Sequence, residues 1–136
     1  MMNTLVRLML VCMLMLGSML MIGAAPAYSA EAVHVYWCEE GDNVTEEQIE
    51  ALASRWLKAA KTMKGGEQLK AYLYYPIAAK LPGKTDLFFL VVAPSAAAWG
   101  AFWDGYKNSP AEKIDMDNRD LVICTDSALM ESVEIK

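Results

Sequence analysis

Residues 87–92 read Leu-Phe-Phe-Leu-Val-Val, an unbroken apolar run of aromatic and branched side chains. Such a run predicts a buried strand. Because successive side chains of a strand point to opposite faces, both faces of this strand are apolar. A strand with one face in water would instead alternate apolar and polar residues. We therefore expect residues 87–92 to lie in a sheet that is covered on both sides.

Three further elements are predicted upstream of this run. Residues 33–38 are rich in β-branched and aromatic side chains and predict a first strand. Thr45 and Gln48 then form a Thr-x-x-Gln capping box, which predicts a helix. Apolar residues recur through it at helical spacing, and Gly65-Gly66 is expected to end it. Residues 69–77 predict a second strand.

Downstream, Ser95 is placed to cap a second helix, which the Asn-Ser-Pro sequence at 108–110 is expected to end. An acidic loop at 115–120 then leads to residues 121–124 and to a final strand around 129–135. The order is strand, helix, strand, strand, helix, strand. This order is the ferredoxin-like split βαβ pattern, an α+β fold with a four-stranded antiparallel sheet and two helices on one face.

The second face of that sheet needs its own cover, because the predicted strand at 87–92 is apolar on both sides. A second sheet from an identical chain would provide it, which predicts a homodimer that associates through the open sheet face. The alternative is partial cover of that face by the long loops.

The N-terminal 30 residues have the layout of a secretory signal peptide: a positively charged start, an apolar block and a small-residue string. We therefore expect a signal peptide at 1–30 and one domain at 31–136, secreted or periplasmic, with no membrane association after cleavage. The alternative is an uncleaved membrane anchor. The formal net charge of −5 makes nucleic acid an improbable partner, because an acidic chain repels phosphate backbones.

Two of the three cysteines, Cys38 and Cys124, lie outside the signal segment. In an oxidising compartment they are most simply interpreted as a disulfide. The predicted topology favours this pairing, because it places the end of the first strand beside the start of the last. The alternative is a pair of buried free thiols.

The candidate ligand-binding residues are aromatic. His34, the only histidine, shares one face of the first strand with Tyr36, and Tyr72 and Tyr74 share one face of the second. If both pairs face the same way, they form a polar-edged aromatic surface for a small apolar ligand. Trp99 and Trp103 of the second helix are placed to line the same space. The alternative roles are dimer packing for the tyrosines and core packing for the tryptophans. We expect no metal site, since residues 115–120 fail the EF-hand pattern, and we expect no cofactor.

The element order, the domain size and the doubly apolar sheet resemble the dimeric α/β-barrel superfamily, which includes antibiotic-biosynthesis-monooxygenase-like and NIPSNAP-like domains. The resemblance covers about residues 33–136. Residues 99–106, Trp-Gly-Ala-Phe-Trp-Asp-Gly-Tyr, followed by Ser109-Pro110, are similar to the second helix of uncharacterised secreted members. The members of this superfamily include cofactor-free oxygenases, haem-degrading enzymes, stress-response proteins and domains without a known reaction, so the resemblance implies a function among these. Haem degradation is disfavoured, because His34 is predicted on a strand and not on a helix.

Three functions follow as hypotheses. The leading one is a homodimeric domain that binds a small apolar molecule or has an accessory role without catalysis. The second is a cofactor-independent oxygenase-like enzyme acting on a small aromatic substrate through Tyr36, Tyr72, Tyr74 and His34. The third is a structural envelope protein that acts through protein contacts. None of the sequence motifs favours one reaction, because one fold serves many activities.

Overall fold

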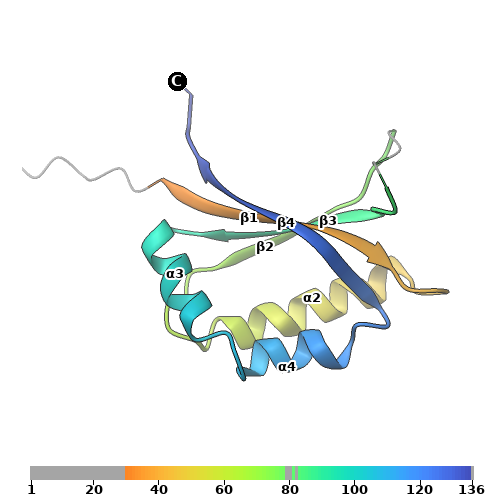
Figure 1. Cartoon of the computed structure of the whole chain (residues 1–136), viewed down its shortest axis with the longest axis horizontal. Helices are drawn as coiled ribbons and strands as arrows, with labels where there is room; N and C mark the ends of the chain where they lie inside the picture. The colour runs from red at the N-terminus through yellow and green to blue at the C-terminus, as the bar shows by residue number, and fades with distance from the viewer. Residues whose placement is uncertain (1–29, 79–80, 82, 136) are drawn as a thin grey trace, which may run out of the picture.

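The computed structural model describes residues 30–78, 81 and 83–135, so most of the expected signal segment lies outside the described residues. The described part forms one sheet and a layer of helices (Figure 1). The strands are β1 (Glu31–Glu40), β2 (Lys70–Tyr74), β3 (Leu87–Ala93) and β4 (Val122–Ser132). The helices are α2 (Glu46–Ala60), α3 (Ala96–Asp104) and α4 (Pro110–Asp117).

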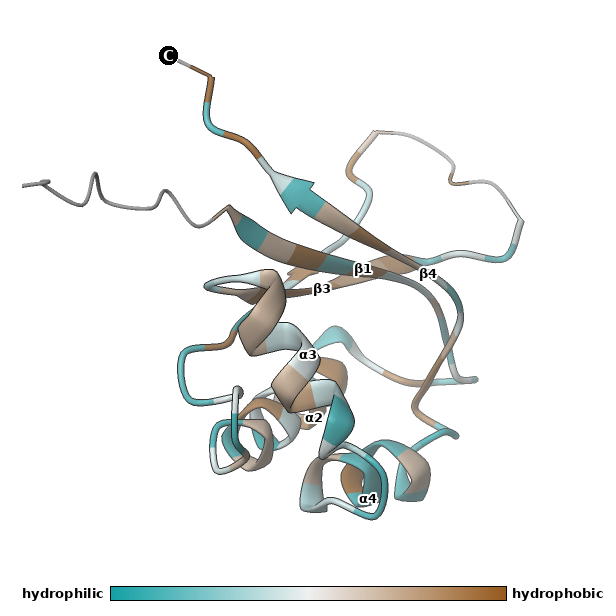
Figure 2. Cartoon of the chain, turned by 60° about the vertical axis from the view of Figure 1, so that its left-hand side comes forward, coloured by the Kyte–Doolittle hydropathy of each residue, from teal (hydrophilic) through white to brown (hydrophobic). Residues whose placement is uncertain are grey.

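The four strands lie in the order β2-β3-β1-β4, and each neighbouring pair is antiparallel. β3 therefore lies between β1 and β2, the split βαβ arrangement of the ferredoxin-like fold. The three helices of the described part lie on one face of the sheet (Figures 1 and 2). The predicted α+β ferredoxin-like fold is confirmed.

α2 begins with the capping box that the sequence predicts. The Thr45 side chain accepts a hydrogen bond from the backbone N–H of Gln48, and the Gln48 side chain accepts one from the backbone N–H of Thr45. The helix ends at Ala60, before the predicted stop at Gly65-Gly66. Residues 61–68 form turns instead, and Gly65, with φ of 81°, redirects the chain toward β2.

The prediction that residues 108–110 end the second helix is wrong. α3 ends at Asp104, and Ser109 begins a third helix, α4, by accepting a hydrogen bond from the backbone N–H of Glu112. Pro110 occupies the first position of α4, where its missing N–H costs nothing. The expected acidic loop at 115–120 is therefore the second half of a helix and the turn that follows it.

The strand limits also differ from the prediction. β2 is shorter than residues 69–77, and β4 is one continuous strand that ends at Ser132. A bulge in the β1–β4 pairing between Trp37 and Cys38 accommodates this length. Beyond the bulge Cys38 lies opposite Cys124, and the two sulfur atoms are bonded at 2.00 Å. The predicted disulfide is confirmed.

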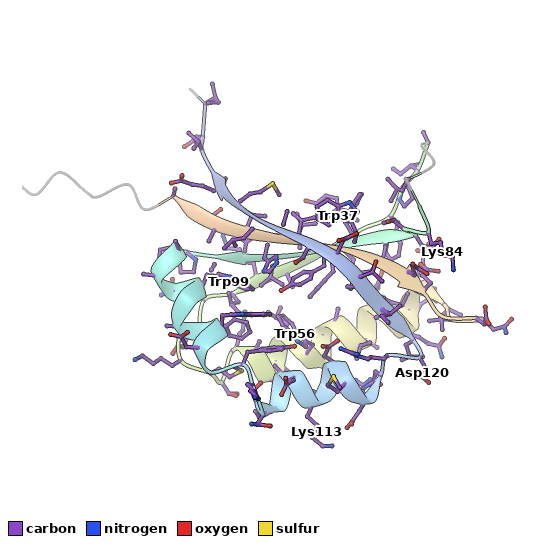
Figure 3. The ribbon with its side chains drawn as sticks, viewed as in Figure 1. Trp37, Trp56, Lys84, Trp99, Lys113 and Asp120 are labelled. Atoms are coloured by element: carbon purple, nitrogen blue, oxygen red, sulfur yellow. A yellow bond between two sulfur atoms is a disulfide. The ribbon has the colours of Figure 1, made fainter. Side chains whose placement is uncertain are left out.

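The core lies between the sheet and the helices. It is built from buried residues such as Trp56, Phe102 and Val91. Trp56 and Trp99 lie in this layer, whereas Trp37 lies on the opposite side of the sheet (Figure 3). None of the helices that the structure describes covers that opposite face (Figure 2). Among the described residues, no helix has the length and apolar character needed to cross a membrane.

Candidate functional site

A cavity of about 170 Å³ lies between the sheet and the helices. We call it the interlayer cavity. Its inner wall is built by buried side chains of β1, α2 and β3, among them Ile49, Leu52, Trp56 and Leu87. An engineered apolar cavity of about 150 Å³ holds benzene, so this volume suits a single-ring molecule.

Aromatic rings from both layers meet around the cavity. Trp56 of α2 makes an edge-to-face contact with Phe89 of β3, with ring centroids 5.3 Å apart. Trp103 stacks on Tyr106 at 5.0 Å with an interplanar angle of 10°. Tyr36 of β1 adds a fifth ring, 6.1 Å from Phe89. These five rings give the cavity flat apolar walls with polar atoms only at their edges.

The mouth of the cavity is marked by its exposed lining residues, which come from α3, from α4 with the turn after it, and from β4. These residues are Trp103, Asp115, Arg119, Ile123 and Cys124. Asp115 lies on α4, and Arg119 follows four residues later, just after the helix ends. The mouth therefore carries one negative and one positive side chain beside an apolar interior.

The surroundings of the Asp115 carboxyl group change its pKa, although the residue as a whole is exposed. Burial of the group raises its pKa, Arg119 opposes this rise, and Glu112 adds to it. Burial also raises the pKa of the Tyr106 hydroxyl, to about 12, with Asp115 contributing. Asp115 therefore lies close enough to the cavity phenols to influence them electrostatically.

Tyr106 is held by a hydrogen bond from Trp56, whose indole Nε1–H donates to the Tyr106 hydroxyl at 3.2 Å. Because an indole nitrogen only donates, the hydroxyl proton of Tyr106 stays available for another acceptor. Tyr106 lines the cavity, so this proton is a candidate donor to a bound molecule.

His34 and Tyr36 lie together on the helix-covered face, as their spacing predicts. A hydrogen bond of 3.0 Å joins the Tyr36 hydroxyl to Nδ1 of His34, and the two rings stack at 4.2 Å. Burial lowers the pKa of His34 and raises that of Tyr36. Tyr36 lines the cavity, whereas His34 is not among the lining residues and instead holds the Tyr36 hydroxyl by this hydrogen bond.

Tyr72 and Tyr74 form a pair of their own, with ring centroids 6.4 Å apart, but they lie on the open face. The register shows this, since Tyr36 pairs with Phe89 and Phe89 with Leu73, whose side chains share the helix-covered face. The neighbours of Leu73 along β2 therefore point the other way. The condition that both aromatic pairs face the same way is not met.

The two candidate tryptophans of α3 also separate. Trp103 lines the cavity mouth and is 47% exposed. Trp99 is buried in the core, where its ring contacts His34 edge-on at 4.9 Å. The disulfide borders the cavity as well, with Cys38 buried and Cys124 exposed.

Sequence reasoning missed Trp56, Phe89, Tyr106 and Asp115 as cavity residues. The first three were assigned to apolar element faces, and only the packing of the two layers shows that those faces leave a space between them. Asp115 was assigned to a solvated loop. Its signal was the Ser109-Pro110 helix start, which places Asp115 on a helix. Among the described residues, no cluster of three or more His, Cys, Asp or Glu side chains is placed to hold a metal ion.

Comparisons with known proteins identify the fold. No protein-family model and no curated protein matches the chain. SnoaB, a cofactor-independent oxygenase from Streptomyces nogalater, superposes with a TM-score of 0.52 at 11% identity, covering 79% of this chain and 97% of that one. A hydroxynitrile lyase from Passiflora edulis gives 0.51 at 8% identity, covering 79% and 95%. A dimeric ferredoxin-like protein of unknown function from Thermobifida fusca gives 0.47 at 14% identity, covering 78% and 92%. The likeness to SnoaB and to the hydroxynitrile lyase shows a shared fold.

Proposed function

We infer that the mature chain is a secreted or periplasmic homodimer in which each protomer binds one small apolar molecule in the interlayer cavity. The observation that carries this proposal is the cavity itself, about 170 Å³, walled by five aromatic rings and open on one side. Ligand sites are typically concave and apolar with a few convergent polar groups. The cavity has these features in Asp115, Arg119 and the Tyr106 hydroxyl.

A cavity-filling variant tests this function. Ala53 lines the cavity from α2, and Ala53→Phe would place a ring in it. We expect 2-phenylethanol to bind the wild-type protein saturably in a calorimetric titration and to lose this binding in Ala53→Phe. Ala51→Phe, on the exposed side of the same helix, is the matched control and should bind as wild type does. Equal binding by both variants would place the ligand elsewhere.

The homodimer rests on the open face of the sheet. Val35, Trp37, Leu90 and Met130 all lie on it, and Tyr72 and Tyr74 extend it over β2. An apolar face of this extent is typical of an interaction surface, and an identical sheet is its simplest cover. We expect the wild-type protein to sediment as a dimer and Leu90→Asp as a monomer. Lys58→Asp, on the exposed side of α2, should leave the dimer intact.

The second candidate function is a cofactor-independent oxygenase, the activity of SnoaB. The specific observation that favours it is the hydrogen-bonded His34–Tyr36 pair behind the cavity, because a histidine and a phenol in contact are able to move a proton. Tyr72 and Tyr74 have no part in this candidate, since they lie on the other face. Oxygen consumption with an electron-rich phenol, lost in Tyr36→Phe and retained in Tyr74→Phe, would support it. Binding without oxygen consumption would leave the binding function alone.

A further inference from the structure

Within the part of the chain that the structure describes, the carboxylate of Asp115 forms no ion pair, although Arg119 acts on it electrostatically. Among the described residues the ion pairs are Lys70–Glu31 and Lys113–Asp117. Lys113, the lysine nearest to Asp115 along α4, is paired with Asp117 instead, with 2.8 Å between its Nζ and Oδ2 of Asp117. Arg119 lies at the same mouth without reaching ion-pair distance of Asp115. Asp115 thus presents a carboxylate outside any ion pair at the edge of an aromatic cavity, with Arg119 acting on it from a longer distance.

The walls beside Asp115 favour a positive charge. The faces of Trp, Tyr and Phe rings attract cations through their quadrupoles, and an organic ammonium between such rings is a recurrent mode of recognition. Trp103 and Tyr106 stack in parallel near the mouth, and Asp115 is close enough to Tyr106 to raise its pKa. Aromatic rings and a carboxylate thus line the same cavity.

The charge of the whole chain acts in the same direction. Its formal net charge of −5 raises the local concentration of cations and lowers that of anions. α4 adds Glu112 and Asp117 to Asp115, against one lysine. Arg119 is the opposing charge at the mouth, and it would weaken the binding of an ammonium group that extends toward it.

Taking the proposed cavity function as its basis, we propose that the occupant is a single-ring arylalkyl amine, with its ring among Tyr36, Trp56 and Phe89 and its ammonium group on Asp115. The cavity volume accepts one aromatic ring and a short chain. The ammonium group then lies at the mouth, where it keeps part of its hydration.

Three probes of similar shape test this inference on the disulfide-bonded mature chain: 2-phenylethylamine, 2-phenylethanol and 3-phenylpropionate. We expect the amine to bind about tenfold more tightly than the alcohol, since a partly exposed ion pair and a cation–π contact together are worth about one factor of ten. The carboxylate should bind most weakly. Titration calorimetry at neutral pH gives all three affinities.

Variants of the mouth identify the group responsible. Asp115→Asn should weaken amine binding about tenfold, and Arg119→Gln should strengthen it severalfold, on the order of one ion-pair interaction. Asp117→Asn is the matched control, an exposed carboxylate on the same helix that is paired with Lys113, and it should bind the amine as wild type does. Equal affinities of the wild-type protein for amine and alcohol would overturn the amine inference and leave the cavity function standing. Failure of every probe to bind would overturn both.

Discussion

Gly65 lies where a side chain would collide with the helix layer. Its φ of 81° is in the left-handed region, and a Cβ built on it would lie 2.3 Å from the backbone oxygen of Ala98 in α3. Glycine therefore satisfies a conformational requirement and a steric one at the same position. The close approach brings the turn after α2 against α3 and so helps to fix the helix that carries Trp103.

We predict that Gly65→Ala lowers the free energy of unfolding by about 1–3 kcal/mol, from backbone strain and the collision with α3. Gly100, in the interior of α3, is the control, because a Cβ there meets no atom within 4 Å. Gly100→Ala should raise the free energy of unfolding by about 0.5–1 kcal/mol, the difference in helix propensity. Urea titrations of both variants measure these changes. A neutral Gly65→Ala would contradict the described packing of the turn on α3.

His34 makes stability depend on pH. Its pKa is lowered from 6.5 by burial, so the folded protein keeps the ring neutral while the unfolded chain takes up a proton near pH 6.5. Its stabilising contribution is fully present above pH 6.5 and is lost as the pH falls through 6.5 toward the lower folded-state pKa. We predict that the unfolding free energy of the wild-type protein falls between pH 7.5 and pH 5 more steeply than that of His34→Gln. Parallel pH profiles of the two proteins would contradict this.

At the scale of elements, α2 was predictable because its signal is local. The capping box of Thr45 and Gln48, the acidic first turn and the apolar periodicity all lie within one segment, and the structure confirms them. α4 was equally local, with a serine cap, a proline at the first position and a glutamate in the first turn. Residues 115–117, in its second half, were interpreted as part of an acidic loop, although Glu112 in the first turn suits the start of a helix.

The cap of α4 provides a direct test. We predict that Ser109→Ala lowers the free energy of unfolding by about 1 kcal/mol, because the backbone N–H of Glu112 loses its acceptor. Ser127→Ala, an exposed position on β4, is the control and should change it by less than about 0.5 kcal/mol. Thermal unfolding followed by circular dichroism measures both. Equal melting temperatures would show that Ser109 does not cap α4.

Relations between elements were only partly predictable. Alternation along one strand places Tyr72 and Tyr74 together, but whether they share a face with His34 depends on the register through β3, where a slip of one residue reverses the faces. The interlayer cavity depends on how three helices pack on the sheet, which no single segment encodes. The disulfide was predictable because topology alone brings the end of β1 beside the start of β4.

At the scale of the whole molecule, the protein is a two-layer structure with unequal faces. Helices cover one face and enclose the cavity, and no helix of the described part covers the other face, where Val35, Trp37 and Leu90 lie (Figure 2). The Cys38–Cys124 bridge lies in the outer half of the sheet, beside the cavity mouth. The same bond therefore fixes β4 to the sheet and one side of the proposed binding site.

We predict that removing the disulfide with the double variant Cys38→Ala, Cys124→Ala lowers the free energy of unfolding by about 4–5 kcal/mol. The bridge closes a loop across 86 residues, and the chain-entropy model gives this magnitude for such a loop. Dithiothreitol should lower the melting temperature of the wild-type protein and leave that of the double variant unchanged. A wild-type melting temperature that is insensitive to reductant would contradict a stabilising bridge.

The most direct test of the central claim uses three of the four tryptophans as reporters. Trp56 donates its indole N–H inside the cavity, Trp103 lies at the mouth, and Trp37 lies on the open face. In a ¹H–¹⁵N NMR titration with 2-phenylethanol, we predict saturable shifts of the Trp56 and Trp103 indole signals, an unmoved Trp37 signal, and no Trp56 shift in Ala53→Phe. A Trp56 signal that stays in place at every ligand concentration, or a shift confined to Trp37, would contradict binding in the interlayer cavity.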